Sequence, residues 1–177
     1  MPQGGLIGVT VIGDDRPGIV ASVTKALYEA GCNLEDVSST ILRGHFAMML
    51  IVRTDEGTDP QELEHRLQEV GAELGLIVTA RPIGDVPAAV EPPTHMVSVY
   101  GADRPGIVFR VTELLARYGI NVTDLTSRVI GPADAPVYAL MLEVVMRDET
   151  TVREGLSALS GELNVDVSLR ALEVDVL

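Results

Sequence analysis

The stretch Asp15-Arg16-Pro17-Gly18-Ile19-Val20, DRPGIV in one-letter code, occurs a second time as Asp103-Arg104-Pro105-Gly106-Ile107-Val108. Shifting the chain by 88 positions aligns residues 15–40 with residues 103–128, and 13 of these 26 positions are identical. Typical amino-acid composition gives about one or two matches by chance over such a length. The chain therefore contains a tandem duplication, and each copy is expected to form the same unit.

Both halves predict the same series of secondary-structure elements. Each begins with a β-rich, partly alternating strand, at residues 6–12 and 96–100. After each DRPG the apolar residues recur at helical spacing, and Gly31 and Gly119 end these helices. The later elements are second strands at 34–42 and 122–130, third strands at 46–52 and 137–145, second helices after Asp59 and Asp148, and fourth strands at 76–80 and 164–172.

The order βαββαβ, found twice, predicts the α+β class. Each unit should have an antiparallel four-stranded sheet with both helices on one face, and its apolar third strand should be central. We place the first domain at residues 1–84, a Pro/Ala-rich linker at 85–93 and the second domain at 94–177. The uncovered sheet face and open edges need a partner, which the other repeat or a homodimer could supply.

Composition and charge limit the binding partners and the cellular compartment that we expect for the chain. The net charge of −13 divides into −7 for residues 1–88 and −6 for residues 89–177. This even acidity argues against direct nucleic-acid binding and against an anionic membrane surface. There is no bilayer-length apolar run and no signal-peptide pattern, and the single Cys32 cannot form an internal disulfide. We therefore expect a cytoplasmic protein.

The DRPG segment permits two interpretations. In the structural one, Asp15 or its neighbour caps the helix, Pro17 presets the first turn, and Gly18 only keeps the backbone slim. In the functional one, a glycine in the first turn lets a carboxylate approach the free N–H groups at the helix start. Asp15 or Asp103 could then receive an ammonium group, with Asn33 or Asn121 nearby as an amide partner.

Two longer stretches carry a family resemblance. Residues 9–34, VTVIGDDRPGIVASVTKALYEAGCNL, and residues 97–122, VSVYGADRPGIVFRVTELLARYGINV, resemble the opening of an ACT domain. The resemblance covers both repeats. It implies the ferredoxin-like βαββαβ fold, an amino-acid-sensing regulatory role, and ligands bound between paired domains. Two ACT repeats with nothing else resemble the glycine cleavage system transcriptional repressor group.

The resemblance also implies which residues bind the ligand. The loop glycine of the family pattern falls on Gly18 and Gly106, the acidic loop residue on Asp15 and Asp103, and the asparagine that opens the second strand on Asn33 and Asn121. The rest of each loop, Arg16-Pro17 and Arg104-Pro105, belongs to the same expected sites. Asp14 adds a negative charge where the second repeat has Ala102, so the second loop is favoured if only one binds.

Other chemistry finds little support in the sequence. His45, His65 and His95 have no short metal-ligand spacing, and no nucleophile elbow or phosphate-binding loop is present. We expect no enzymatic activity, cofactor or metal. The expected function is small-molecule sensing, possible control of transcription in amino-acid or glycine metabolism, and action through a protein partner. A detached regulatory subunit of an amino-acid or one-carbon metabolic enzyme, or a ligand-free assembly module, are the alternatives.

Overall fold

The computed structural model describes residues 4–84 and 91–172. The chain divides into two compact units, Met1–Ala88 and Ala89–Leu177, and each is described by itself. Most of the predicted linker, 85–93, lies outside the described residues. Among the described residues, no helix has the length and apolar character needed to cross a membrane.

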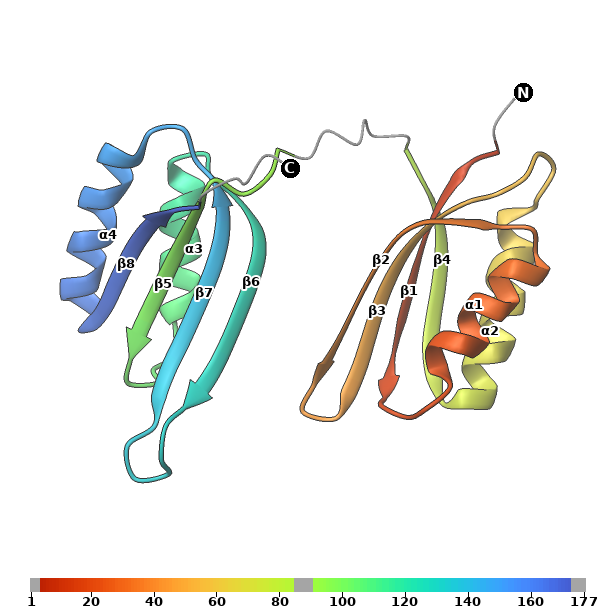
Figure 1. Cartoon of the computed structure of the whole chain (residues 1–177), viewed down its shortest axis with the longest axis horizontal. Coiled ribbons are helices and arrows are strands. Elements are labelled where there is room, and N and C mark those ends of the chain that lie inside the picture. The colour runs from red at the N-terminus through yellow and green to blue at the C-terminus, as the bar shows by residue number, and fades with distance from the viewer. Residues whose placement is uncertain (1–3, 85–90, 173–177) are drawn as a thin grey trace. The chain divides into compact units, whose positions relative to one another are not determined.

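The first unit has the predicted βαββαβ order (Figure 1). Its four strands form an antiparallel sheet in the order β2-β3-β1-β4, so the apolar third strand is central, as predicted. The elements are β1 (Leu6–Asp14), α1 (Ile19–Glu29), β2 (Asn33–Leu42), β3 (His45–Arg53), α2 (Pro60–Leu74) and β4 (Leu76–Ile83).

The second unit repeats this architecture. Its antiparallel sheet has the order β6-β7-β5-β8, which is the same order when counted within the unit. The elements are β5 (His95–Gly101), α3 (Ile107–Arg117), β6 (Asn121–Ile130), β7 (Val137–Val145), α4 (Glu149–Leu163) and β8 (Val165–Ala171). The predicted α+β class with two ferredoxin-like units is thereby confirmed.

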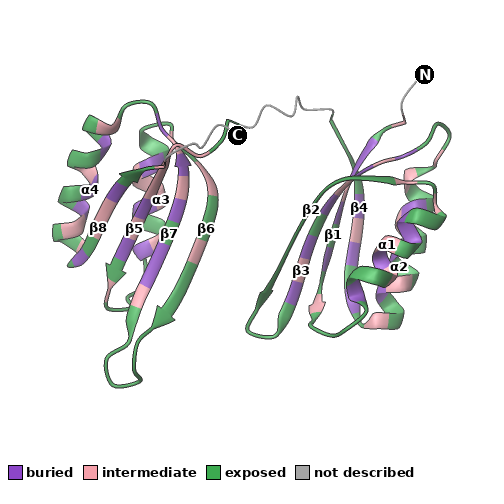
Figure 2. Cartoon of the chain, viewed as in Figure 1, coloured by how far each residue is buried: buried purple, intermediate pink, exposed green. Residues whose placement is uncertain are grey.

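Both helices of each unit lie on one face of its sheet, and the apolar core lies between them (Figure 2). Alternate strand residues point into this core, which explains the period of two in the strands. Val9, Leu50 and Leu67 are fully buried in the first core, and Val97, Leu115 and Leu142 in the second. The opposite, helix-free face of each sheet is called its open face below.

The second helix of each unit begins at the predicted aspartate. The Asp59 carboxylate accepts a hydrogen bond of 2.9 Å from the Gln61 amide, and the Asp148 carboxylate accepts one of 3.0 Å from the Thr150 amide. The first helices end as predicted, because the residues that follow their caps, Gly31 and Gly119, have left-handed φ values of 72° and 67°.

The edge strands β2 and β6 extend beyond the cover of the helices. Every residue of β2 is exposed, and most residues of β6 are exposed as well. In the first unit, β2 pairs with β3 on one side, and no other described strand pairs with its outer edge. This is the open edge that the element order predicts.

Candidate functional site: the two DRPG loops

The two DRPG segments form the connections between the first strand and the first helix of each unit. Residues 15–18 link β1 to α1, and residues 103–106 belong to the connection between β5 and α3. All eight of these residues are exposed. The sequence therefore brings Asp15, Arg16, Pro17 and Gly18 to one surface position, and Asp103, Arg104, Pro105 and Gly106 to the corresponding one.

The glycine of each loop is the N-cap of the helix, which corrects the expectation that an aspartate caps it. Gly18 has φ 98° and ψ −13°, Gly106 has φ 96° and ψ −5°, and neither helix has a side-chain capping hydrogen bond. Residues with a Cβ adopt this left-handed backbone at a cost of about 1 kcal/mol or more. The backbone needs glycine here, one residue before the first turn rather than within it.

The first turns of α1 and α3 keep their N–H donors free of internal acceptors. The first helical bonds run from the Ser22 amide to the Gly18 carbonyl and from the Arg110 amide to the Gly106 carbonyl, each 2.9 Å long. The amides that precede these two have no acceptor inside the helix. Neither first turn contains an acidic residue, whereas α2 and α4 have a capping aspartate and a glutamate in the first turn.

The space beside each glycine is open. Apart from its two neighbours in the chain, a Cβ atom built on Gly18 or on Gly106 meets no described atom within 4 Å. A ligand atom can therefore approach the backbone at this point without displacing a side chain. The helix start combines this access with donors and the positive end of the helix dipole, which together favour an anion.

The two loops differ in their immediate neighbours. The Asp15 amide donates to the Gly44 carbonyl at 2.9 Å, which ties the first loop to the turn between β2 and β3. The carboxylate of Asp14 lies 3.1 Å from the His45 ring, and both side chains are exposed. In the second unit the corresponding positions of the sequence are Ala102 and Val137, so this pair of polar groups is absent there.

The asparagines lie at the far end of each unit, contrary to the expectation that they neighbour the loops. Asn33 pairs with Arg53, whose other neighbour is Leu6 at the start of β1, whereas the loop follows the end of β1. The nine residues of β1 separate these ends by roughly 26 Å. The helix carries the chain back along the sheet, so β2 runs parallel to β1 and begins at the opposite end. Asn121 has the same position in β6.

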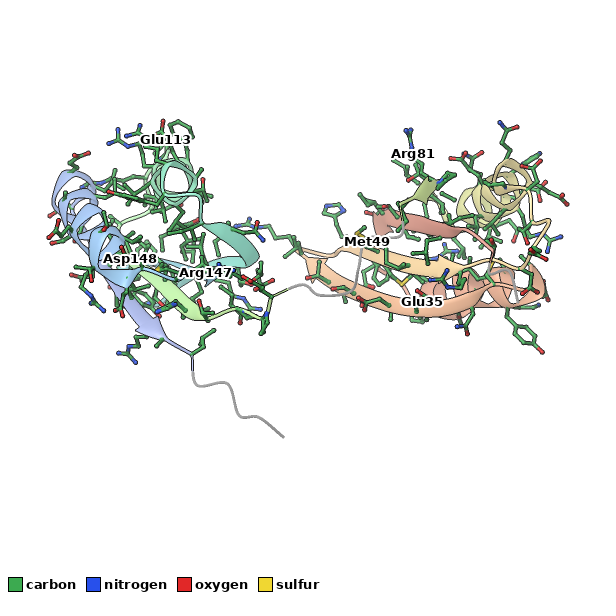
Figure 3. The ribbon with its side chains drawn as sticks, turned by 90° about the horizontal axis from the view of Figure 1, so that it is seen from above. Glu35, Met49, Arg81, Glu113, Arg147 and Asp148 are labelled. Atoms are coloured by element: carbon green, nitrogen blue, oxygen red, sulfur yellow. The ribbon has the colours of Figure 1, made fainter. Side chains whose placement is uncertain are left out.

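Two hollows lie at this far end, where the first helix ends and the second begins. The first has a volume of about 260 Å³ and includes Ala30 and Asp59 in its lining. The second, of about 510 Å³, is lined in part by Asn121 and by Arg147 and Asp148, which Figure 3 labels beside α4. The described residues that line these hollows include none from either DRPG loop.

The remaining polar candidates are the single cysteine and the residue types that bind metals. Cys32 is partly buried against the first core, and burial raises the pKa of its thiol, with a smaller increase from Asp55 and an opposing effect from Arg66. The thiolate form is therefore disfavoured. Within residues 4–84 and 91–172, no cluster of three or more His, Cys, Asp or Glu residues could hold a metal ion.

The fold and the site define a class of protein: a tandem of ferredoxin-like α+β modules, each with an open helix start after its first strand. The chain belongs to the ACT domain family: one model of this family matches residues 6–81, and another matches residues 95–154.

Individual relatives agree with this assignment. The chain is 29% identical over 174 residues to the glycine cleavage system transcriptional repressor of Escherichia coli K12, and the match covers 93% of this chain and 88% of the relative. A UPF0237 protein of Methanopyrus kandleri is 48% identical over 71 residues, which is 40% of this chain and 79% of that protein. A solved structure of an unknown protein from Galdieria sulphuraria matches with a TM-score of 0.79 and 26% identity, covering 96% of this chain and 99% of that one. The ACT family match and the similarity to the repressor support a regulatory, ligand-sensing role.

Proposed function

We propose that this chain is a non-enzymatic regulatory protein that binds a small amino acid at one or both DRPG loops and transmits the bound state to a protein partner. One observation carries the proposal. Of the four helix starts, those of α2 and α4 contain their own carboxylates, whereas those of α1 and α3 have a glycine cap, free amides and open space.

An amino acid fits the chemistry of this surface. Its carboxylate would accept hydrogen bonds from the first-turn amides, where the helix dipole adds favourable electrostatic energy. Its ammonium group would lie near the acidic loop residue, Asp15 or Asp103. The second loop is the stronger candidate, because it has Ala102 where the first has the additional carboxylate of Asp14.

The position of the asparagines affects how such a ligand is held. The loop and the asparagine lie at opposite ends of each unit, roughly 26 Å apart. One ACT domain therefore cannot offer both groups to one small molecule. A ligand that contacts Asn33 or Asn121 as well as a loop would have to be shared by two ACT domains, which agrees with the family's binding between paired domains.

A protein partner is proposed for the output. The Escherichia coli relative is a transcriptional repressor by name. The net charge of −13 disfavours direct contact between this chain and DNA, because binding to phosphates relies on Lys and Arg. A repressor of this charge would act in the cytoplasm by holding another protein, such as a transcription activator. Ligand binding would shift the population between arrangements that the partner distinguishes.

Thermal denaturation of the full chain with each amino acid tests the binding proposal. A ligand at 100 times its dissociation constant stabilises the state that binds it by about 2.7 kcal/mol, which shifts the melting temperature measurably. Glycinamide and other amides, which lack the carboxylate, serve as matched controls and should have no effect. If no amino acid shifts the transition, or if the amides act as well as the acids, the loop proposal is wrong.

Affinity capture with the full chain tests the output separately. Recovery of a transcription factor, in an amount that depends on the amino acid, supports the proposal. Recovery of an amino-acid or one-carbon metabolic enzyme would instead identify the chain as a detached regulatory subunit.

A further inference from the structure

The open face of the second sheet is defined by the side chains that alternate with its core residues. Its four strands contribute Asp166, Ser168 and Arg170 from β8, Met96, Ser98 and Tyr100 from β5, Ala139, Met141 and Glu143 from β7, and Asp124, Thr126 and Arg128 from β6. The helices cover the other face, so nothing in the described part of this unit packs over these residues (Figure 2).

The strand register arranges the charges of this face at its corners. One row across the sheet reads Asp166, Tyr100, Ala139, Arg128, and a second row reads Arg170, Met96, Glu143, Asp124. The four corner residues, Asp166, Arg170, Asp124 and Arg128, are all exposed. Each edge strand carries one negative and one positive corner residue, and the two corner residues of each row also have opposite charges.

The corner charges have no partners among the described residues of their own chain: within residues 4–84 and 91–172, Asp124, Arg128, Asp166 and Arg170 form no ion pair and no side-chain hydrogen bond. Asp124 and Glu143 lie directly opposite each other in the register between β6 and β7. Two like charges in that position repel each other, so a cation placed over them would stabilise the sheet.

We propose that the open face of the second sheet is a homodimer interface, which pairs with the same face of a second copy. A two-fold axis parallel to the strands and in the plane between the sheets places β6 of each copy over β8 of the other. Arg128 then meets Asp166 of the partner subunit. Arg170 meets the partner subunit's Asp124 and lies beside the partner's Glu143. Each charged corner meets the opposite sign, and symmetry repeats every contact.

The centre of the face allows close approach of the two sheets. Ser98, Ala139 and Met141 lie between the charged corners, and Met141 is 37% exposed. Sheets that pack face to face lie about 10 Å apart and cross at about 30°, an offset that long arginine side chains can span. Strand spacings give a face of about 19 by 23 Å. This is at the small end of specific interfaces, so we expect a dimer that dissociates on dilution.

The open face of the first sheet is a poorer partner for this surface. Its two corresponding rows read Ile77, Ile12, Ala47, Thr40, with no charged residue, and Arg81, Gly8, Ile51, Asp36, with charges at both ends. A face with this pattern could match Arg170 and Asp124, but its uncharged row would bury Arg128 and Asp166 without opposite charges, which is costly. Two copies of the second face match opposite charges at all four corners.

Sedimentation of the full chain over about three orders of magnitude in concentration tests the proposal. We expect a monomer–dimer equilibrium that weakens with added salt. Arg128→Glu places a carboxylate against the partner subunit's Asp166 and should raise the dissociation constant at least about tenfold. The double variant Arg128→Glu/Asp166→Arg restores opposite charges under this two-fold axis and should recover most of the affinity. Arg153→Glu reverses a charge on α4, away from the face, and should have no effect.

Other outcomes would overturn the proposal. They are a chain that stays monomeric throughout, a dimer that Arg128→Glu leaves intact, or a double variant no better than the single one. Circular dichroism of each variant shows whether it is folded. Because Arg128 and Asp166 are exposed, we expect all of them to keep the secondary structure of the native chain.

Discussion

A glutamate placed in the first turn of α1 or α3 should increase stability while weakening ligand binding. Ala21→Glu and Phe109→Glu put the new carboxylate at the third helical residue, the position that Glu62 occupies in α2. Ala21 is exposed, and Phe109 is 62% exposed, so neither change removes a core contact. Each variant gives its helix the internal anion that the native sequence omits.

The effect on folding follows from the helix dipole. A carboxylate in the first turn stabilises a helix by about 0.3–1 kcal/mol at a surface site. For a unit of this size, that corresponds to an increase of about 1–8 °C in the melting temperature. The unliganded variant should therefore be at least as stable as the native chain, which separates this change from mutations that weaken binding by damaging the fold.

The effect on binding follows from Coulomb's law. Two negative charges 5 Å apart repel by about 0.8 kcal/mol in water and by about 3.3 kcal/mol at an effective dielectric of 20. The affinity for an amino acid should therefore fall by at least about fourfold, and by more if the site excludes water. Added salt should reduce this loss.

Titration calorimetry and thermal denaturation, done on the same samples, measure both effects. Ala21→Gln and Phe109→Gln are the matched controls, because they add nearly the same shape without the charge. Equal ligand affinity in the Glu and Gln variants at both helices would refute the assignment of the carboxylate site. A Glu variant that loses stability would show that the native first turns are not open to an anion.

Four further substitutions test the fold and its local energetics. Gly106→Ala should lower the melting temperature by several degrees, because a φ of 96° costs a residue with a Cβ atom about 1 kcal/mol or more. Gly161→Ala lies in open space on α4 and should raise the free energy of unfolding by about 0.5–1 kcal/mol. Thermal denaturation measures both effects. Leu140→Ala empties a fully buried core position and should cost about 2–5 kcal/mol in urea unfolding. Cys32 should react slowly with a thiol reagent until the pH exceeds 9.0, the ordinary pKa of a cysteine thiol. The free energy of unfolding should fall as the pH rises through the raised pKa of Cys32, because the folded state favours the neutral thiol. Asp55→Asn removes one cause of the raised pKa and should speed the reaction.

The order of strands and helices could be predicted because the same pattern of apolar residues occurs independently in both halves of the chain. An ambiguous apolar run in one repeat is resolved by its counterpart in the other. Asp59 and Asp148 were identified as helix starts because a side-chain cap is visible as a residue type. The same reasoning failed at Gly18, where capping depends on a backbone angle and the nearby aspartate suggested the wrong residue.

The large distance between the loops and the asparagines could not be predicted from the sequence either. Asn33 follows Gly18 by only 15 residues, and this proximity along the chain suggested proximity in space. A helix of 11 residues spans about 16 Å, so it returns the chain to the other end of the sheet. The pairing of surface charges across strands, by contrast, depends on register and on the bulge between Val122 and Asp124, which the sequence pattern does not specify.

A comparison of helix starts within the chain explains why the repeated loop points to function. The helices α2 and α4 both begin with an aspartate cap, yet the residues that follow, Pro60-Gln61-Glu62 and Glu149-Thr150-Thr151, have nothing in common. Starting a helix thus tolerates almost complete divergence between the two halves. The segment DRPGIV is identical at all six positions, including exposed Asp, Arg and Pro residues that cap nothing. The left-handed backbone accounts for the glycine and the buried core for the isoleucine, whereas the identity of the exposed Asp, Arg and Pro residues agrees with the proposal that a ligand contacts them.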